Sequence, residues 1–252
     1  MSSFRVIPAL LLKNGGLVKG RAFKNHIYVG DPVNAVRIFN AKEVDELFFF
    51  DIDSTINGRH IDFDLVAKLG NECYMPFAVG GGINSLNIIS KLIELGVEKV
   101  VINSHAISNP EFINKASNMF GSQAIVVSID YKIINGKPKI FTHSGTKETN
   151  LEVLEFTNII ADMGAGELVL NSIVRDGVRS GFDIELIKKI SESVSIPVIG
   201  GCGAGHIDHF LDLKSNTTVS AATAGSFFVL HGPLEAVLIS YPKKSEFVNL
   251  LA

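Results

Sequence analysis

The 252-residue sequence predicts an α/β fold: a single (β/α)8 TIM barrel that spans residues 1–252 and is made of two half-barrel repeats. Three observations predict it. They are an internal repeat, eight apolar runs that alternate with helical segments, and a 46% hydrophobic content that can bury one large core. Because no linker-like or low-complexity stretch divides the chain, we expect one domain.

The internal repeat consists of paired motifs at a constant spacing. Residues 46–50 (ELFFF) match residues 167–171 (ELVLN) at an offset of 121 positions. The same offset carries the glycine turn at 80–82 onto the one at 201–203. Since the register holds without a gap, each half is expected to have the same order of elements.

Within each half, the apolar runs have the length and β-branched content of strands covered on both faces, and the intervening segments have helical period. Asp62 and Asp183 are candidate N-caps of two helices. The expected strands are Arg5–Leu12, Glu46–Asp51, Phe77–Gly80, Lys99–Asn103, Ala124–Asp130, Glu167–Asn171, Pro197–Gly201 and Thr218–Ala224. The expected helices are Val33–Val44, Phe63–Asn71, Leu86–Leu95, Pro110–Met119, Leu151–Met163, Ile184–Ser193, Ile207–Leu213 and Pro233–Ser240.

Composition argues against several classes of protein. A net charge of -3 with scattered lysines and arginines gives no surface for nucleic acid. No run of about 18 apolar residues and no signal-like start occur, so we expect a cytoplasmic protein without a membrane partner. Cys73 and Cys202 are too few for a disulfide framework, and His206 and His209 resemble surface residues more than ligands. We expect no metal and no cofactor.

The two glycine turns follow strands three and seven, where a barrel of this class binds its ligands. Glycine lets backbone N–H groups crowd around an anion, which favours phosphate binding over the alternative of a simple tight turn. Two facing cups would suit an elongated ligand with a phosphate at each end. The candidate residues are Gly81, Gly82, Asn103 and Ser104 in the first cup, and Cys202, Gly203, Gly225 and Ser226 in the second.

Three carboxylates, Asp51, Asp130 and Asp176, the last followed by Gly177, lie at the same rim. Rim carboxylates can move protons to and from a substrate, although loop-capping is an equal alternative for Asp51 and Asp176. A nucleophilic role for Cys202 is not expected, because no base is identifiable beside it. The long loops, about Lys13–Asp31 and Lys132–Asn150, are candidate lids or surface decoration.

Four charged residues stand at strand starts, at the end opposite the rim. Two cations and two anions can form an inward ring of salt bridges that closes the barrel floor. A purely structural plug is the default interpretation. The four residues are Arg5, Glu46, Lys99 and Glu167.

These motifs identify a resemblance. Over nearly its full length the chain resembles the cyclase (HisF-like) subunit of imidazole glycerol phosphate synthase, a lyase of histidine biosynthesis. The motifs that carry the resemblance are 5–8 (RVIP), 18–20 (VKG), 30–32 (GDP), 77–83, 102–104 (INS), Asp130, 166–171 (GELVLN), 176–177 (DG) and 203–205 (GAG).

The resemblance implies a bisphosphate aminoimidazole precursor in the two cups, and ammonia that passes through the barrel from a glutaminase (HisH-like) partner in a heterodimer. It makes the charged ring the ammonia gate, and it matches Lys19 to the lysine of a mobile loop that closes over substrate. The family uses two catalytic aspartates. Asp130 matches one, but Leu11 stands where the strand-one aspartate belongs. A leucine cannot transfer a proton, and each general acid–base step contributes about 10²- to 10⁴-fold.

With an aspartate missing, the chain resembles a paralogous form of the subunit whose gene accompanies surface-polysaccharide genes. The resemblance then implies a barrel subunit of a glutamine amidotransferase complex, an ammonia channel that serves acetamido-sugar amidation in O-antigen (lipopolysaccharide) biosynthesis, with a separate sugar amidotransferase as a further partner. Two alternatives stay open. One is a true cyclase that makes imidazole glycerol phosphate and AICAR, and the other is a different sugar-phosphate enzyme on the same scaffold.

Overall fold

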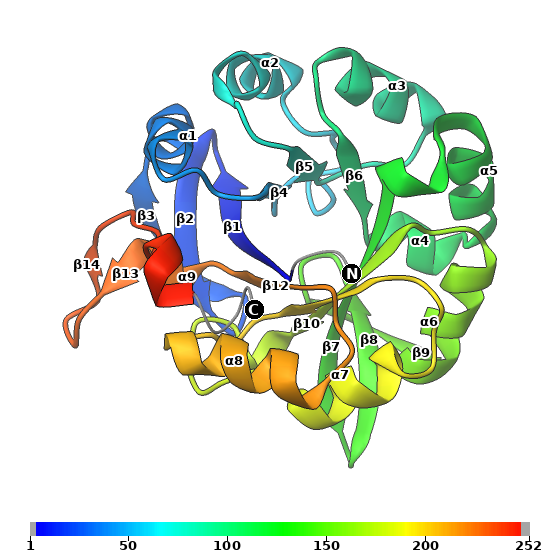
Figure 1. Cartoon of the computed structure of the whole chain (residues 1–252). Helices are drawn as coiled ribbons and strands as arrows, with labels where there is room; N and C mark the ends of the chain where they lie inside the picture. The colour runs from blue at the N-terminus through cyan, green and yellow to red at the C-terminus, as the bar shows by residue number, and fades with distance from the viewer. Residues whose placement is uncertain (1–3, 248–252) are drawn as a thin grey trace.

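In the computed structural model, which describes residues 4–247, eight parallel strands close into a barrel with helices around the outside (Figure 1). Closure is direct, because β10 pairs with both β7 and β11 while β1 pairs with both β12 and β4. The barrel strands are β1 (Arg5–Lys13), β4 (Leu47–Asp51), β5 (Phe77–Gly80), β6 (Lys99–Ile102), β7 (Ile125–Ile134), β10 (Glu167–Ser172), β11 (Val198–Gly201) and β12 (Ala221–Ala224). The predicted (β/α)8 fold class is confirmed.

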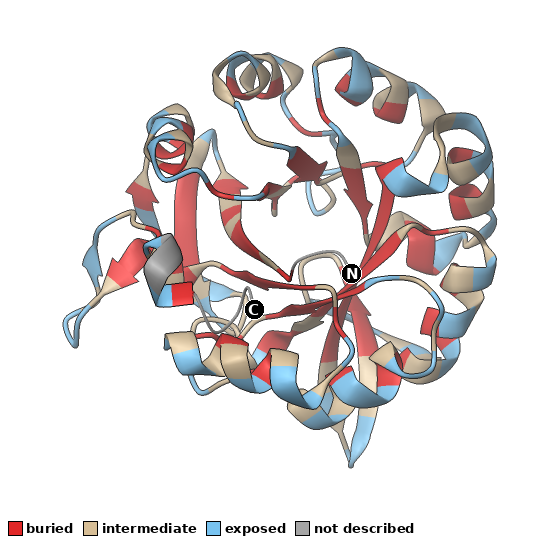
Figure 2. Cartoon of the chain, in the orientation of Figure 1, coloured by how far each residue is buried: buried red, intermediate tan, exposed pale blue. Residues whose placement is uncertain are grey.

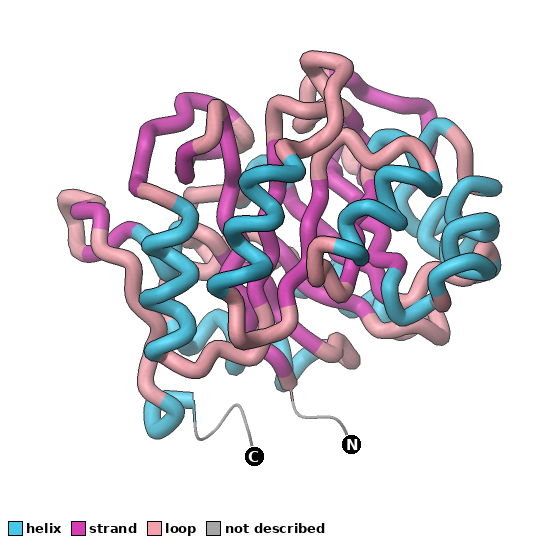
Figure 3. The backbone as a smooth tube through the Cα atoms, turned by 90° about the horizontal axis from the view of Figure 1, so that it is seen from above, coloured by secondary structure: helices cyan, strands magenta, loops and turns pink. Residues whose placement is uncertain are grey.

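The helices stand outside the sheet, and strands extend beyond them at one end of the barrel (Figure 3). The α-helices are α1 (Pro32–Ala41), α2 (Phe63–Glu72), α3 (Leu86–Glu94), α4 (Ser104–Ser108), α5 (Glu111–Phe120), α6 (Val153–Asp162), α7 (Ile184–Ser191), α8 (Ile207–Asn216) and α9 (Ser226–Val229). The 3₁₀ turns are η1 (Ser122–Ala124), η2 (Ile173–Arg175) and η3 (Lys244–Phe247). Within the described residues, no helix is both long and apolar enough to cross a membrane.

One of the two expected side-chain caps forms. The Asp62 carboxylate accepts the backbone N–H groups of Asp64 and Leu65 and caps α2. Asp183 precedes α7 but makes no capping bond; its carboxylate instead accepts the Tyr131 hydroxyl at 3.0 Å. A competing tertiary partner therefore overrides the local preference.

The core has two layers, separated by the sheet. The outer layer packs the helices on the strands, where Figure 2 shows the buried residues gathered. The inner layer fills the barrel with apolar side chains, as expected for a packed barrel rather than a pore. Its members are Ile7, Phe48, Ala78, Val101, Val126, Val169, Ile199 and Ala221.

Both long rim loops are hairpins rather than irregular segments. The expected loop at about 13–31 contains β2 (Gly16–Arg21) and β3 (Lys24–Gly30), because β1 continues to Lys13 and pairs with β2. The loop at about 132–150 contains β8 (Lys137–Thr142) and β9 (Lys147–Glu152), which extend β7 in the same way. Strand pairing thus satisfies the backbone of segments that were expected to be long loops.

The helix expected at Pro233–Ser240 is wrong. This stretch forms most of a hairpin of β13 (Leu230–His231) and β14 (Ala236–Val237), which stands off beside β3 in Figure 1. Gly232 takes a positive φ of 70° at the turn, and Tyr241 then re-enters the core, stacks on Phe228 at 5.3 Å and donates its hydroxyl to the Val6 carbonyl. Tertiary aromatic packing replaces the closing helix.

Substitution of Phe228 tests this packing. The ring is fully buried against Phe39, Phe210 and Tyr241, so Phe228→Ala should lower the free energy of unfolding by about 3–5 kcal/mol. Chemical denaturation measures the change. Leu234→Ala, at a side chain that is 93% exposed, is the control and should stay within about 0.5 kcal/mol of wild type. Equal effects of the two substitutions would contradict this account of the C-terminal segment.

Candidate functional site

The barrel floor is closed by a cycle of four ion pairs. Arg5 contacts Glu46 and Glu167, each at 2.6 Å. Lys99 contacts the same two carboxylates at 2.8 and 2.9 Å. Because each carboxylate meets both cations, the charges compensate one another, which buried ions require. The ring of charges inferred from the strand starts is present in the structure.

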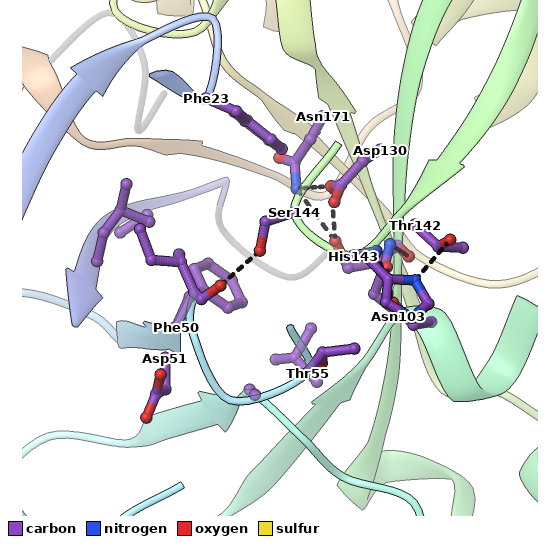
Figure 4. A pocket seen from close by; sticks show the side chains of 18 of the residues that line it. Phe23, Phe50, Asp51, Thr55, Asn103, Asp130, Thr142, His143, Ser144 and Asn171 are labelled. Carbon is purple, nitrogen blue, oxygen red and sulfur yellow. Dashed lines mark hydrogen bonds between the residues drawn. The ribbon is translucent and has the colours of Figure 1, made fainter. Parts of the chain in front are cut away.

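At the other end of the barrel, the strand C-termini surround a cavity of about 510 Å³. Polar and apolar side chains reach into it from both halves (Figure 4). Every rim residue singled out in the sequence lines this cavity, and so does Leu11. Those residues are Lys19, Asp51, Gly81, Gly82, Asn103, Ser104, Asp130, Asp176, Gly177, Cys202, Gly203, Gly225 and Ser226.

The two glycine turns are built alike. Gly82 has a φ of 65° and lies so close to the Arg59 carbonyl that no Cβ fits. Gly203, at a φ of 108°, lies equally close to the Gly181 carbonyl. Both turns therefore need glycine for the same two reasons, and both present backbone to the cavity.

Asp130 is the best-placed acid in the cavity. Its Oδ1 accepts the Asn171 amide at 3.0 Å, as Figure 4 shows, and the Ser128 hydroxyl at 3.5 Å. Burial raises the pKa of Asp130 to about 6, although both hydrogen bonds act in the opposite direction. A carboxyl group with this pKa can hold or release a proton near neutral pH.

Lys19 and Asp176 are two further titratable groups of the cavity, and their charges interact. Lys19 on β2 is buried and donates to the Ala9 carbonyl at 2.6 Å, with its ammonium against Gly225. Burial lowers the pKa of Lys19 to about 8, while the charge of Asp176 opposes that shift. Burial likewise raises the pKa of Asp176, whose carboxylate accepts the Phe23 N–H at 3.3 Å.

Two other predicted site residues, Asp51 and Asn103, already make hydrogen bonds within the protein. Asp51 accepts the backbone N–H groups of Asp53 and Ser54 and pairs with Arg59 at 2.7 Å, which favours the loop-capping alternative. Asn103 donates to the Ser128 carbonyl and accepts the Ser104 hydroxyl.

Cys202, His206 and His209 add no acid–base group to the cavity. Burial raises the pKa of Cys202 well above its usual value, so it stays a thiol. His206 is an N-cap that accepts the Asp208 N–H, and His209 accepts the Gly205 N–H. Among residues whose side chains are described, no three His, Cys, Asp or Glu groups are arranged to hold a metal ion.

Sequence reasoning missed the contacts that hold the cavity together. Asn171 donates to both Ser128 and Asp130, and its signals in the sequence were its position at a strand end and its place in the 166–171 motif. Across the mouth, Ser144 donates to the Ile52 carbonyl at 2.6 Å, and Gly145 lies close to Phe23. The β2–β3 and β8–β9 hairpins therefore meet over the cavity, a contact between segments distant in sequence.

Comparison with known proteins agrees with this geometry. Residues 5–233 match the model of a family described as histidine biosynthesis protein. The chain belongs to that family. It is 48% identical over 239 residues to imidazole glycerol phosphate synthase subunit hisF2 of Pseudomonas aeruginosa, covering 94% of this chain and 95% of that protein.

Two further relatives carry the name of the same synthase subunit. A HisF subunit of Leptospira interrogans is 42% identical over 244 residues, covering 96% of both chains. A hisF3 subunit of Vibrio vulnificus is also 42% identical over 244 residues, covering 96% of this chain and 94% of that protein. All three names are provisional assignments. The resemblance to HisF-like subunits is confirmed at the level of the family.

The raised pKa of Asp130 predicts a pH-dependent stability. The unfolded carboxyl group titrates near 4 and the folded one at about 6, so the folded state binds the proton more tightly. This contribution is fully present below about pH 4 and is lost as the pH rises to about 6. Asp130→Asn should therefore stabilise the protein by about 1–3 kcal/mol at pH 7 and by much less at pH 4, as measured by urea denaturation. A variant effect that is equal at both pH values would contradict the prediction.

Proposed function

We propose that this chain is the barrel subunit of a glutamine amidotransferase complex. It binds a glutaminase at the floor and conducts ammonia through the barrel to the amidation of an acetamido sugar in surface-polysaccharide biosynthesis, where a separate sugar amidotransferase completes the reaction. The single observation that carries this proposal is an imbalance: the charged floor is complete, whereas Leu11 replaces one of the two expected acids of the mouth.

The floor and lumen support conduction. Ions that cross an apolar lumen lose their hydration, whereas neutral ammonia loses far less. The inner layer above the ring is apolar throughout, so it favours the neutral form. The proposed gate is the ring formed by Arg5, Glu46, Lys99 and Glu167, because its four ion pairs close the floor of the barrel.

The mouth supports loss of cyclase chemistry. Leu11 and Asp130 line the same cavity, but only Asp130 can exchange a proton. A missing acid–base group costs about 10²- to 10⁴-fold in rate. The cups can still hold a phosphorylated small molecule, and Lys19 beside Gly225 places positive charge at the second one.

A working cyclase of histidine biosynthesis is the second candidate, and one observation favours it. Asp130 keeps a pKa of about 6, and Asp176 with its own raised pKa lines the same cavity. If Asp176 served as the second acid–base group, the chain would convert the bisphosphate precursor and ammonia to imidazole glycerol phosphate and AICAR. The names of the three relatives also point in this direction.

Reconstitution with a HisH-like glutaminase separates the two candidates. The purified chain should raise glutamine hydrolysis by the glutaminase at least tenfold, while the bisphosphate precursor with ammonium gives no turnover at rates typical of a cyclase. Lys99→Met, which breaks the ring, should lower the stimulation, whereas Lys91→Met on the exposed face of α3 should not. Rapid precursor turnover, or rescue of a histidine auxotroph, would establish the cyclase instead.

Restoring the missing acid is the sharper test of the mouth. Leu11→Asp should increase cyclase turnover by about 10²-fold or more if only this group is absent, because it recreates a pair with Asp130. Steady-state assays with the bisphosphate precursor and ammonium measure the gain. Leu11→Asn, of similar size but without an acid, is the matched control and should show no gain.

A further inference from the structure

Four inward strand positions at the cavity differ in polarity between the two halves of the barrel, although polar residues such as Asn103 and Ser104 also line the first half. At these four positions each residue of the first half has a counterpart at the related position of the second half, and all eight residues line the cavity. In each pair the first member is apolar and the second is polar. The pairs are Ala9 and Ser128, Leu11 and Asp130, Phe50 and Asn171, and Val101 and Thr223.

The same difference in polarity is found at the strand ends directly beneath the two glycine turns. A Cβ on Gly80 would lie 2.9 Å from the Phe50 ring and 3.2 Å from Val101, so these two side chains close over the strand end under the first cup. At Gly201 the corresponding neighbour is the Asn171 amide. The first cup therefore stands on an aromatic ring and a valine, and the second on a hydrogen-bonding group.

The two halves accordingly accept different chemistry. Asn171 binds Asp130 and Ser128, and Thr223 donates to the Ile7 carbonyl, so the second half presents an ordered polar surface. Over Phe50 and Leu11, a ligand hydroxyl group would give up its water without gaining a partner. A flat apolar group there would instead bury its surface and stack on the ring. Figure 4 shows Phe50 well separated from the linked Asp130 and Asn171.

Positive charge is available near the first cup. Lys147 follows the turn whose His143 N–H binds the Ser104 hydroxyl, and it lines the same cavity. The guanidinium of Arg59 also lines the cavity but is paired with Asp51, and only the Arg59 backbone carbonyl lies against Gly82. Lys147 is therefore a cation available in the cavity that contains the first cup, whose strand end is covered by Phe50.

We propose that the first cup selects a phosphate monoester whose attached group is flat and apolar, an aryl phosphate rather than a hydroxylated sugar phosphate, with Phe50, Leu11 and Val101 as the specificity-determining residues. This inference rests on the proposed binding of phosphate at the cups. It is independent of ammonia conduction and of glutaminase binding.

Calorimetry with two small probes tests the selection. Phenyl phosphate should bind the full-length protein at least tenfold more tightly than glycerol 3-phosphate, because only its ring can occupy the apolar wall. Leu11→Asn and Phe50→Asn, the latter copying Asn171 at the related position, should each reduce the ratio toward one by weakening phenyl phosphate binding. Leu234→Asn, on the exposed β13–β14 hairpin, is the control and should keep the wild-type ratio.

Three outcomes would overturn the inference. Equal affinities in wild type, or a preference that survives both Asn variants, would show that the apolar wall does not select the ligand while leaving phosphate binding intact. Failure of both probes to bind would remove phosphate binding at the first cup and the inference with it. Glutaminase stimulation, measured separately, then shows whether the proposed subunit role stands. Because Leu11 and Phe50 are only partly buried, a circular dichroism spectrum of each variant confirms that it is folded.

Discussion

Closure of the parallel sheet is the constraint on which the rest of the molecule depends. With β7 paired to β10 and β12 to β1, all eight parallel strands of the barrel start at the floor and end at the mouth. Alternate side chains must then point inward, because strand residues alternate between faces. The floor ring, the apolar lumen and the mouth cavity are successive levels of the same eight strands.

The two halves preserve backbone features more strictly than side chains. Gly82 and Gly203 each lie against a carbonyl of the preceding loop, where any Cβ would collide, so these positions cannot drift. An inward side chain at the cavity has more freedom, because it borders open space. The related positions therefore carry different side chains, with Leu11 corresponding to Asp130 and Phe50 to Asn171. The same backbone arrangement presents an apolar surface in one half and a polar surface in the other at these positions.

Charge is handled differently at the two ends. At the floor, each of Glu46 and Glu167 meets both Arg5 and Lys99, so burial is matched by opposite charge. In the mouth, burial shifts the pKa of Asp130 upward and that of Lys19 downward, because neither group has a full counter-charge. Incomplete compensation of this kind is typical of sites that bind or transfer charge rather than of sites that only stabilise a fold.

The sequence by itself determined the barrel, the twofold repeat, the glycine turns and the rim residues, because period, spacing and glycine content are local properties of the chain. Tertiary structure decided the rest. The two long loops form hairpins because they pair with strand extensions, and the expected helix at Pro233–Ser240 is replaced by a hairpin followed by Tyr241 packing on Phe228. The contrast between the four apolar and four polar inward residues becomes a feature of one cavity only when the barrel closes, because the two members of each pair lie on different strands.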